Sequence, residues 1–130
     1  MALWLYLIRM FAITGFYHRY FSHRAFQTSR WFQFFGAALG NAAVQRGPLW
    51  WCAHHRSHHA HSDEPQDMHS PRQHGFWWSH IGWLTTPQNF VTKKQYVGDW
   101  LKVPELRWLN RFNILVPLAL AVGLFGFGML

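Results

Sequence analysis

The stretch from Gly47 to Asp63, GPLWWCAHHRSHHAHSD, carries the main functional signal of this 130-residue sequence. Three of its histidines, His55, His58 and His59, form the pattern HxxHH. Residues three and four apart lie on the same face of a helix, so a helix over residues 49–61 would bring three imidazoles into one small volume. Imidazole is a suitable ligand for iron, zinc, copper and nickel. We therefore predict a metal site on this helix.

A second histidine pattern precedes the first. His18 and His23 form HxxxxH, and five residues turn an ideal α-helix about 140° past a full turn. The two rings are therefore not expected to share a face. They would approach a metal from opposite flanks, or after the helix unwinds. HxxxxH followed by HxxHH, both beside apolar segments, strongly indicates metal binding.

Other chemistries fit the sequence less well. The zinc-hydrolase pattern HExxH is absent, because Arg56, Ser57 and His58 separate His55 from His59. Phosphate-binding loops and serine-nucleophile motifs are also absent from the sequence. A single cysteine, Cys52, excludes an intrachain disulfide, and we interpret it as a small buried apolar residue.

The remaining histidines have weaker claims to a role. His54 and His61 flank the HxxHH pattern, and either could be a surface residue or a second layer that orients a ligand. We interpret His69, His74 and His80 as surface residues, because isolated exposed histidines usually have no ligand.

The composition favours a membrane protein. Half of the residues are apolar and 19% are aromatic, whereas only 13% are charged, about half the usual share. We predict a single, all-α integral membrane domain over residues 1–130. Residues 1–17 and 112–130 are its membrane helices, and residues 18–111 form a cytoplasmic and interfacial region that bears the histidines.

The charge distribution supports this arrangement. The net charge is +7 and, apart from Arg9, every Lys and Arg lies between Arg19 and Arg111. A basic face between apolar ends fits an anionic lipid leaflet better than nucleic acid, and the positive-inside rule makes that face cytoplasmic.

Local signals predict some of the helix boundaries. Ser29 is a suitable N-cap for a short interfacial or re-entrant helix over residues 31–44. Residues 62–75 are typical of a loop. Pro104–Arg111 resembles the start of a helix.

Three runs resemble the acyl-CoA desaturases of the stearoyl (Δ9) type, in the order and near the spacing of that family. They are TGFYHRYFSHR (14–24), GPLWWCAHHRSHHAHSD (47–63) and HSPRQHGFWWSHIGW (69–83). The resemblance implies a partial desaturase fold, with membrane and interfacial helices and a cytoplasmic histidine-bearing region. It also implies two iron ions, whose ligands include His18, His23, His55, His58 and His59.

The family's reaction follows from the resemblance. Such enzymes use dioxygen and two electrons from a cytochrome b5 or ferredoxin donor to convert a saturated acyl chain, on CoA or a lipid, to a cis-monounsaturated one. Substrate or headgroup contacts are expected from Arg46, Arg56 and Arg72, and from Trp50 and Trp51, although aromatic residues also anchor membrane interfaces.

One departure from the family matters. Its third histidine box has no counterpart, since no histidine follows His80. We expect a fragment that cannot build a complete di-iron site alone. A membrane di-iron hydroxylase of alkanes, sterols or other lipids, and an inactive metal-binding membrane fragment, remain as alternatives.

Overall fold

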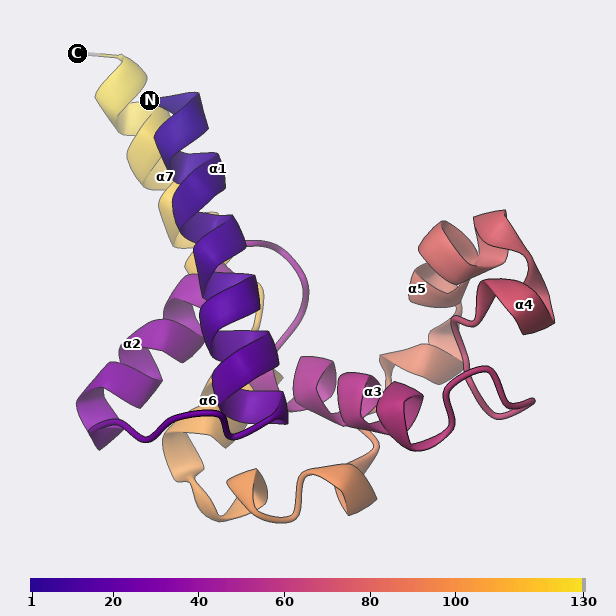
Figure 1. The fold of residues 1–130 in the computed structure, drawn as a ribbon. Coiled ribbons are helices and arrows are strands. Elements are labelled where there is room, and N and C mark those ends of the chain that lie inside the picture. The colour runs from indigo at the N-terminus through magenta and orange to yellow at the C-terminus, as the bar shows by residue number, and fades with distance from the viewer. Residues whose placement is uncertain (130) are drawn as a thin grey trace.

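The computed structural model describes residues 1–129, and within that range the secondary structure is entirely helical (Figure 1). The longer helices are α1 (Ala2–Phe11), the π-helix η1 (Ala12–Ser22), α2 (Arg30–Asn41), α3 (Pro48–Ala60), α6 (Pro104–Arg111) and α7 (Leu115–Gly128). The short ones are α4 (Pro71–His74), the π-turn η2 (Trp78–Gly82), α5 (Trp83–Thr85) and the 3-10 turns η3 (Pro87–Phe90), η4 (Lys94–Tyr96) and η5 (Trp100–Lys102). The predicted all-α class is confirmed.

The first long helix changes its winding part of the way along. α1 passes directly into η1, so the helix runs beyond the predicted end at residue 17 and stops at Ser22. A π-helix has hydrogen bonds between residues five apart; such winding is rare and is frequently found at functional sites. This segment carries His18, and His23 follows it directly.

Two glycines let η1 pack closely against α2. A Cβ atom on Gly36 would lie 2.0 Å from the Phe16 ring, and one on Gly40 would lie 2.1 Å from the Tyr17 ring. The spacing GxxxG is a known way to bring helices close together. Tyr17 is fully buried, so this contact sets the position of the residue next to His18.

Polar contacts fix the junction of η1, α2 and α6. The hydroxyl of Tyr17 donates to the side-chain oxygen of Asn41, and the amide of Asn41 donates to the carbonyl of Leu109 at 3.1 Å. Asn41 is fully buried, and a buried amide costs free energy unless it is hydrogen-bonded. Around these groups lies the apolar core, which includes Phe16, Phe21, Ala37, Leu49, Cys52, Ala53, Val97, Trp100, Leu106 and Leu109.

Several predicted boundaries agree with the structure. The hydroxyl of Ser29 accepts from the backbone N–H of Phe32 and caps α2. α3 begins at Pro48, a favoured first helical residue, and α6 begins at Pro104, the expected start of a helix. Cys52 is buried, as expected.

Other boundaries differ. The segment expected to be one helix from residue 112 begins with a turn over 112–114, and only then does α7 start; residue 130 lies outside the described residues. The predicted loop 62–75 contains one helical turn, α4, because Ser70 caps it and Pro71 starts it.

The two ends of the chain project to the same side of the molecule (Figure 1). No residue of α1 or α7 is buried, although both helices are apolar. Taken singly, no helix within residues 1–129 has both the length and the hydropathy to cross a membrane. The pair α6 and α7, bent by 64°, meets these criteria only when both are counted together.

Candidate metal centre

The π-helical segment places His18 and His23 next to each other. The backbone N–H of His23 donates to the carbonyl of His18 at 3.1 Å, a five-residue hydrogen bond that widens the helix. The centres of the two imidazole rings are 4.6 Å apart. The expectation that these rings would lie on different faces assumed α-helical winding, and it is wrong for this segment.

His55 and His59 lie one turn apart on α3 and face the same two rings. Nε2 of His55 is 3.1 Å from Nε2 of His23, and the ring centres of His55 and His59 are 4.5 Å apart. One ligand nitrogen from each of the four residues lies within 4.8 Å of the other three. We call His18, His23, His55 and His59 the four-histidine group, because four nitrogens this close can surround one metal ion.

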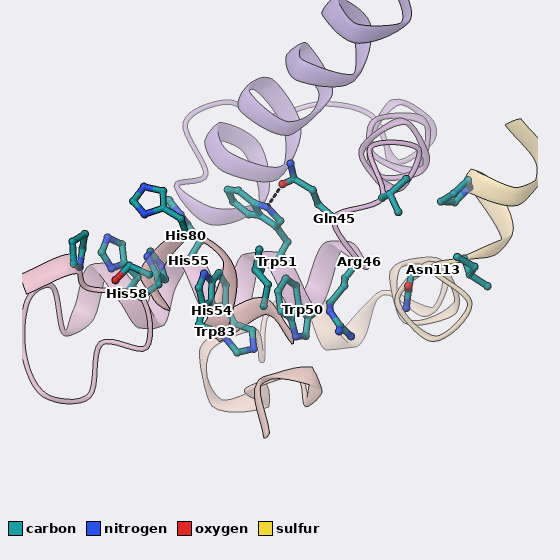
Figure 2. A pocket seen from close by; sticks show the side chains of 17 residues that line it. Gln45, Arg46, Trp50, Trp51, His54, His55, His58, His80, Trp83 and Asn113 are labelled. Atoms are coloured by element: carbon teal, nitrogen blue, oxygen red, sulfur yellow. Dashed lines mark hydrogen bonds between the residues drawn. The ribbon is translucent and has the colours of Figure 1, made fainter. Parts of the chain in front are cut away.

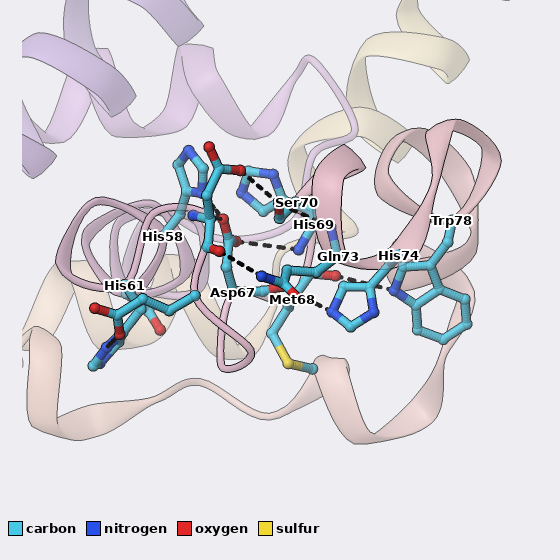
Figure 3. A network of polar contacts seen from close by, with 12 residues as sticks. His58, His61, Asp67, Met68, His69, Ser70, Gln73, His74 and Trp78 are labelled. Atoms are coloured by element: carbon cyan, nitrogen blue, oxygen red, sulfur yellow. Dashed lines mark hydrogen bonds and ion pairs between the residues drawn. The ribbon is translucent and has the colours of Figure 1, made fainter.

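His58 does not join this group, which corrects the prediction that all three HxxHH rings converge. Positions i+3 and i+4 fall on opposite sides of position i, about 100° apart around a helix. His59 therefore faces His23, whereas His58 faces the loop that follows α3. There it forms a second group with Asp67 and His69, shown in Figure 3.

Asp67 holds His58 in a defined orientation. Both carboxylate oxygens of Asp67 lie 2.9 Å from Nδ1 of His58, and they also accept the backbone N–H groups of Asp63 and His69. Burial opposes ionisation of this carboxyl, but the hydrogen bonds outweigh burial and the pKa of Asp67 is lowered. Because Nδ1 is engaged, Nε2 of His58 is the nitrogen left for a metal.

Burial and neighbouring histidines keep the imidazoles of His55 and His23 neutral. Burial, followed by the effect of the neighbouring His59 and His18, lowers the pKa of His55 to about 3. Burial, His18 and His59 also lower the pKa of His23. Neutral imidazole is the form that binds a metal, so both rings are ready to bind at neutral pH.

Comparison with known proteins shows the family to which this chain belongs. The family model described as fatty acid desaturase matches residues 1–130. The chain belongs to the fatty acid desaturase family. It is similar to the sn-2 palmitoyl-lipid 9-desaturase of Nostoc sp. (strain 36), with 37% identity over 86% of this chain and 41% of that protein.

Two plant desaturases are similar to this chain to a comparable degree. The chloroplastic palmitoyl-monogalactosyldiacylglycerol delta-7 desaturase of Arabidopsis thaliana is 40% identical over 95% of this chain and 34% of its own length. The acyl-CoA 5-desaturase AL21 of Anemone leveillei is 36% identical over 91% of this chain and 38% of its own length. The chain thus spans well under half the length of these relatives. No solved structure matches it.

A cleft of about 910 Å³ adjoins both histidine groups in this desaturase chain (Figure 2). His55, His58 and His69 lie at one part of its lining, and Trp50, Trp51 and Trp83 form its aromatic walls; Arg46, Asn113 and Pro117 also line it. The Trp51 ring stacks on His55 with ring centres 4.8 Å apart. The indole N–H of Trp50 donates to the carbonyl of Asn89 at 2.7 Å. Trp51 therefore lies beside His55 of the four-histidine group, Trp50 lies beside His54 with ring centres 4.5 Å apart, and the contact of both tryptophans with substrate stays a prediction.

The three predicted arginines have different surroundings. The Arg46 guanidinium lies 3.8 Å from the centre of the Phe90 ring and 5.1 Å from that of Trp50, and burial lowers its pKa. Arg72 is exposed on α4. Arg56 is bound to backbone carbonyls and to Asp99, which does not resemble the headgroup contact expected for it.

The two flanking histidines contact loop residues. Nε2 of the buried His54 lies 3.2 Å from the carbonyl of Val91, and burial lowers the pKa of His54 to about 4. His61 lies 3.1 Å from both Glu64 and the hydroxyl of Tyr96. Their proposed part in orienting metal ligands stays a prediction.

The sequence interpretation missed Asp67 and His69. His74 and His80 are exposed, as expected. His69, however, is half-buried, with its ring centre 4.1 Å from that of His58 and 4.9 Å from Trp83. The available signal was the acidic loop directly after HxxHH, since a carboxylate is a common partner for a metal-binding histidine.

Proposed function

We propose that this chain forms part of an O2-dependent, di-iron membrane desaturase that converts a saturated fatty acyl chain to a cis-monounsaturated one. The observation that carries the proposal is the four-histidine group, whose ligand atoms lie within 4.8 Å of one another. Family membership supplies the reaction class. We propose position 9 for the double bond, as in the name of the Nostoc relative.

The residues present fit an iron ion. The donor set is four imidazole nitrogens, a kind of ligand that suits iron. We assign one iron to the four-histidine group and the second to His58, through its Nε2. Asp67 is better suited to orienting His58 than to ligation, because three donors already occupy its carboxylate. The second iron thus needs ligands beyond these, such as the family's third histidine box in a longer protein.

When both irons are bound, they supply the activation of dioxygen. The protein's own part is to hold the acyl chain beside them and to limit the access of water. The cleft suits this role, because its volume is within the usual range for ligand pockets and Trp50, Trp51 and Trp83 line it. Arg46 places a positive charge on the same lining, and we propose that it binds an anionic group of the CoA or lipid carrier.

We further propose that the chain is embedded in a membrane, with the histidines on the cytoplasmic side. α1 and α7 expose large apolar side chains, including Trp4 at 70% and Phe125 at 72% of their full accessible area. Apolar surfaces of this extent mark membrane or protein contacts. The exposed Arg72 would then face lipid headgroups or the acyl carrier, and the net charge of +7 would attract an acidic electron donor of the cytochrome b5 or ferredoxin type.

The test is lipid analysis of cells that express the full gene, with His55→Ala as the matched control. We expect new monounsaturated acyl chains that disappear in the control. Hydroxylated acyl products would replace the proposal with a hydroxylase. No change in lipids, together with less than one metal ion per purified chain, would support an inactive fragment.

The carrier can be separated in the same system. Double bonds that appear first in the acyl-CoA pool indicate a CoA substrate, whereas double bonds that appear first in intact membrane lipids indicate an acyl-lipid substrate. The relatives include desaturases named for each kind.

A further inference from the structure

The side chain of Arg56, a residue of α3, contacts the end of η1. Nη2 donates to the carbonyl of Phe21 at 2.7 Å, and Nε donates to the carbonyl of Ser22 at 3.0 Å. Nη1 donates to the carbonyl of Tyr96 at 2.8 Å and to the carboxylate of Asp99 at 3.0 Å. All three guanidinium nitrogens are therefore engaged within the protein.

Two of the carbonyls that accept from Arg56 lie at the C-terminal end of η1, where a helix needs hydrogen-bond donors from outside. Phe21 and Ser22 are the last residues of η1, and the final carbonyls of a helix have no partner within it. The C-terminus of a helix also carries partial negative charge, which a cation stabilises. Arg56 provides the charge and a donor to each of the two carbonyls, and the indole N–H of Trp100 also donates to the carbonyl of Phe21 at 2.8 Å.

Asp99 extends the contact to the other side of His23. Its carboxylate binds Arg56 and also accepts from Nε of Arg24 at 2.9 Å. His23 is therefore flanked by Ser22, whose carbonyl Arg56 binds, and by Arg24, whose side chain is tied to the same carboxylate. These bonds join the segment around His23 to α3.

We propose that Arg56 is a positioning residue of the metal centre, and that it acts by holding His23 against His55 and His59. Arg56 lies on α3 next to His55, so one helix supplies two ligands and the clamp that fixes a third. The inference rests on the proposed function, because it assumes that the four-histidine group binds metal. It replaces the headgroup contact expected from sequence with an internal role.

The test is Co²⁺ titration of the purified full chain in detergent micelles, with the visible spectrum of bound Co²⁺ as a second readout. Arg56→Lys keeps the charge but loses the planar fork that reaches several acceptors. We expect metal affinity to fall by about 10- to 100-fold, the usual effect of removing a group that orients a ligand. The Co²⁺ spectrum should change and the helix content should not. Arg107→Lys, at an exposed arginine on α6, should leave both unchanged.

A double-mutant cycle with His23→Ala separates positioning from general stabilisation. If Arg56 acts through His23, Arg56→Lys should weaken Co²⁺ binding less than about twofold once His23 is gone. An undiminished effect in that background would overturn the inference. Asp99→Asn, which disrupts the same clamp, should weaken binding in the same direction, and it serves as the test should Arg56→Lys not fold.

Failure of the inference and failure of the proposed function give different results. If the wild-type chain and Arg56→Lys bind Co²⁺ equally tightly, the role of Arg56 is refuted and the proposed metal centre is not. A wild-type chain that takes up neither Co²⁺ nor Fe²⁺ refutes the metal centre itself, and the inference with it.

Discussion

The contact between η1 and α2 predicts a large effect from one added methyl group. In Gly40→Ala, the new Cβ would lie 2.1 Å from Cε1 of Tyr17, far inside the 3.4 Å at which ordinary contacts begin. The Tyr17 ring cannot move easily, because it is fully buried and its hydroxyl binds Asn41. The strain must therefore be taken up by separating the two helices.

Two opposing effects set the change in the free energy of unfolding of Gly40→Ala. Overpacking a core typically costs 1–3 kcal/mol, and a clash this short with a fixed ring puts Gly40→Ala at about 3 kcal/mol. Replacing glycine by alanine within a helix returns about 1 kcal/mol. We expect a net loss of about 2 kcal/mol in the free energy of unfolding.

Gly126→Ala is the matched control. Gly126 lies in α7, and a Cβ there would meet no atom within 4 Å. Only the helix-propensity term applies, so this variant should be neutral or more stable by up to about 1 kcal/mol. The two variants should thus differ by about 2–3 kcal/mol.

Circular dichroism during denaturant unfolding in detergent would measure this difference. Because Tyr17 directly precedes His18, Gly40→Ala should also weaken Co²⁺ binding, whereas Gly126→Ala should not. A Gly40→Ala variant as stable as Gly126→Ala would refute the close packing of η1 on α2, and with it the explanation of how His18 is held.

Three further perturbations test the site. Asp67→Asn should lower the free energy of unfolding by about 2 kcal/mol, since it weakens charge-assisted hydrogen bonds, and ring-nitrogen NMR should show His58 losing its single tautomer; an unchanged His58 spectrum would count against the role of Asp67. His55→Ala should reduce Co²⁺ binding at the four-histidine group by more than tenfold, and equal uptake by both proteins would contradict the assignment. The folded-state pKa of His54, about 4, lies below the value of about 6.5 in an unfolded chain. The unfolded state therefore binds the extra proton first, and the stability of the metal-free protein should fall as pH drops from 6.5 towards 4; urea unfolding at pH 7 and pH 5 should show a smaller pH effect in His54→Phe.

Much of the local structure could be predicted from the sequence. The start of α6 at Pro104 and the cap at Ser29 depend on single residues whose preferences are strong and local. The pairing of His55 with His59 follows from one turn of an ordinary α-helix. These predictions succeed because each depends on the geometry of a few consecutive residues.

The parts that could not be predicted depend on contacts distant in sequence. The pairing of His58 with Asp67 depends on the course of the loop that follows α3. The role of Arg56 depends on carbonyls that precede it by 34 and 35 positions. The spacing of the histidines in HxxxxH and HxxHH does not predict these contacts.

The π-helix η1 depends both on its local sequence and on contacts with distant residues. A spacing of five residues aligns His18 with His23 only where the helix makes five-residue hydrogen bonds, a winding that short-range preferences rarely favour. Here Phe16 and Tyr17 of the segment pack against Gly36 and Gly40, and Arg56 caps its end. The HxxxxH spacing is therefore informative only together with the helix it packs on, and the four-histidine group depends on tertiary packing as much as on the spacing of its histidines.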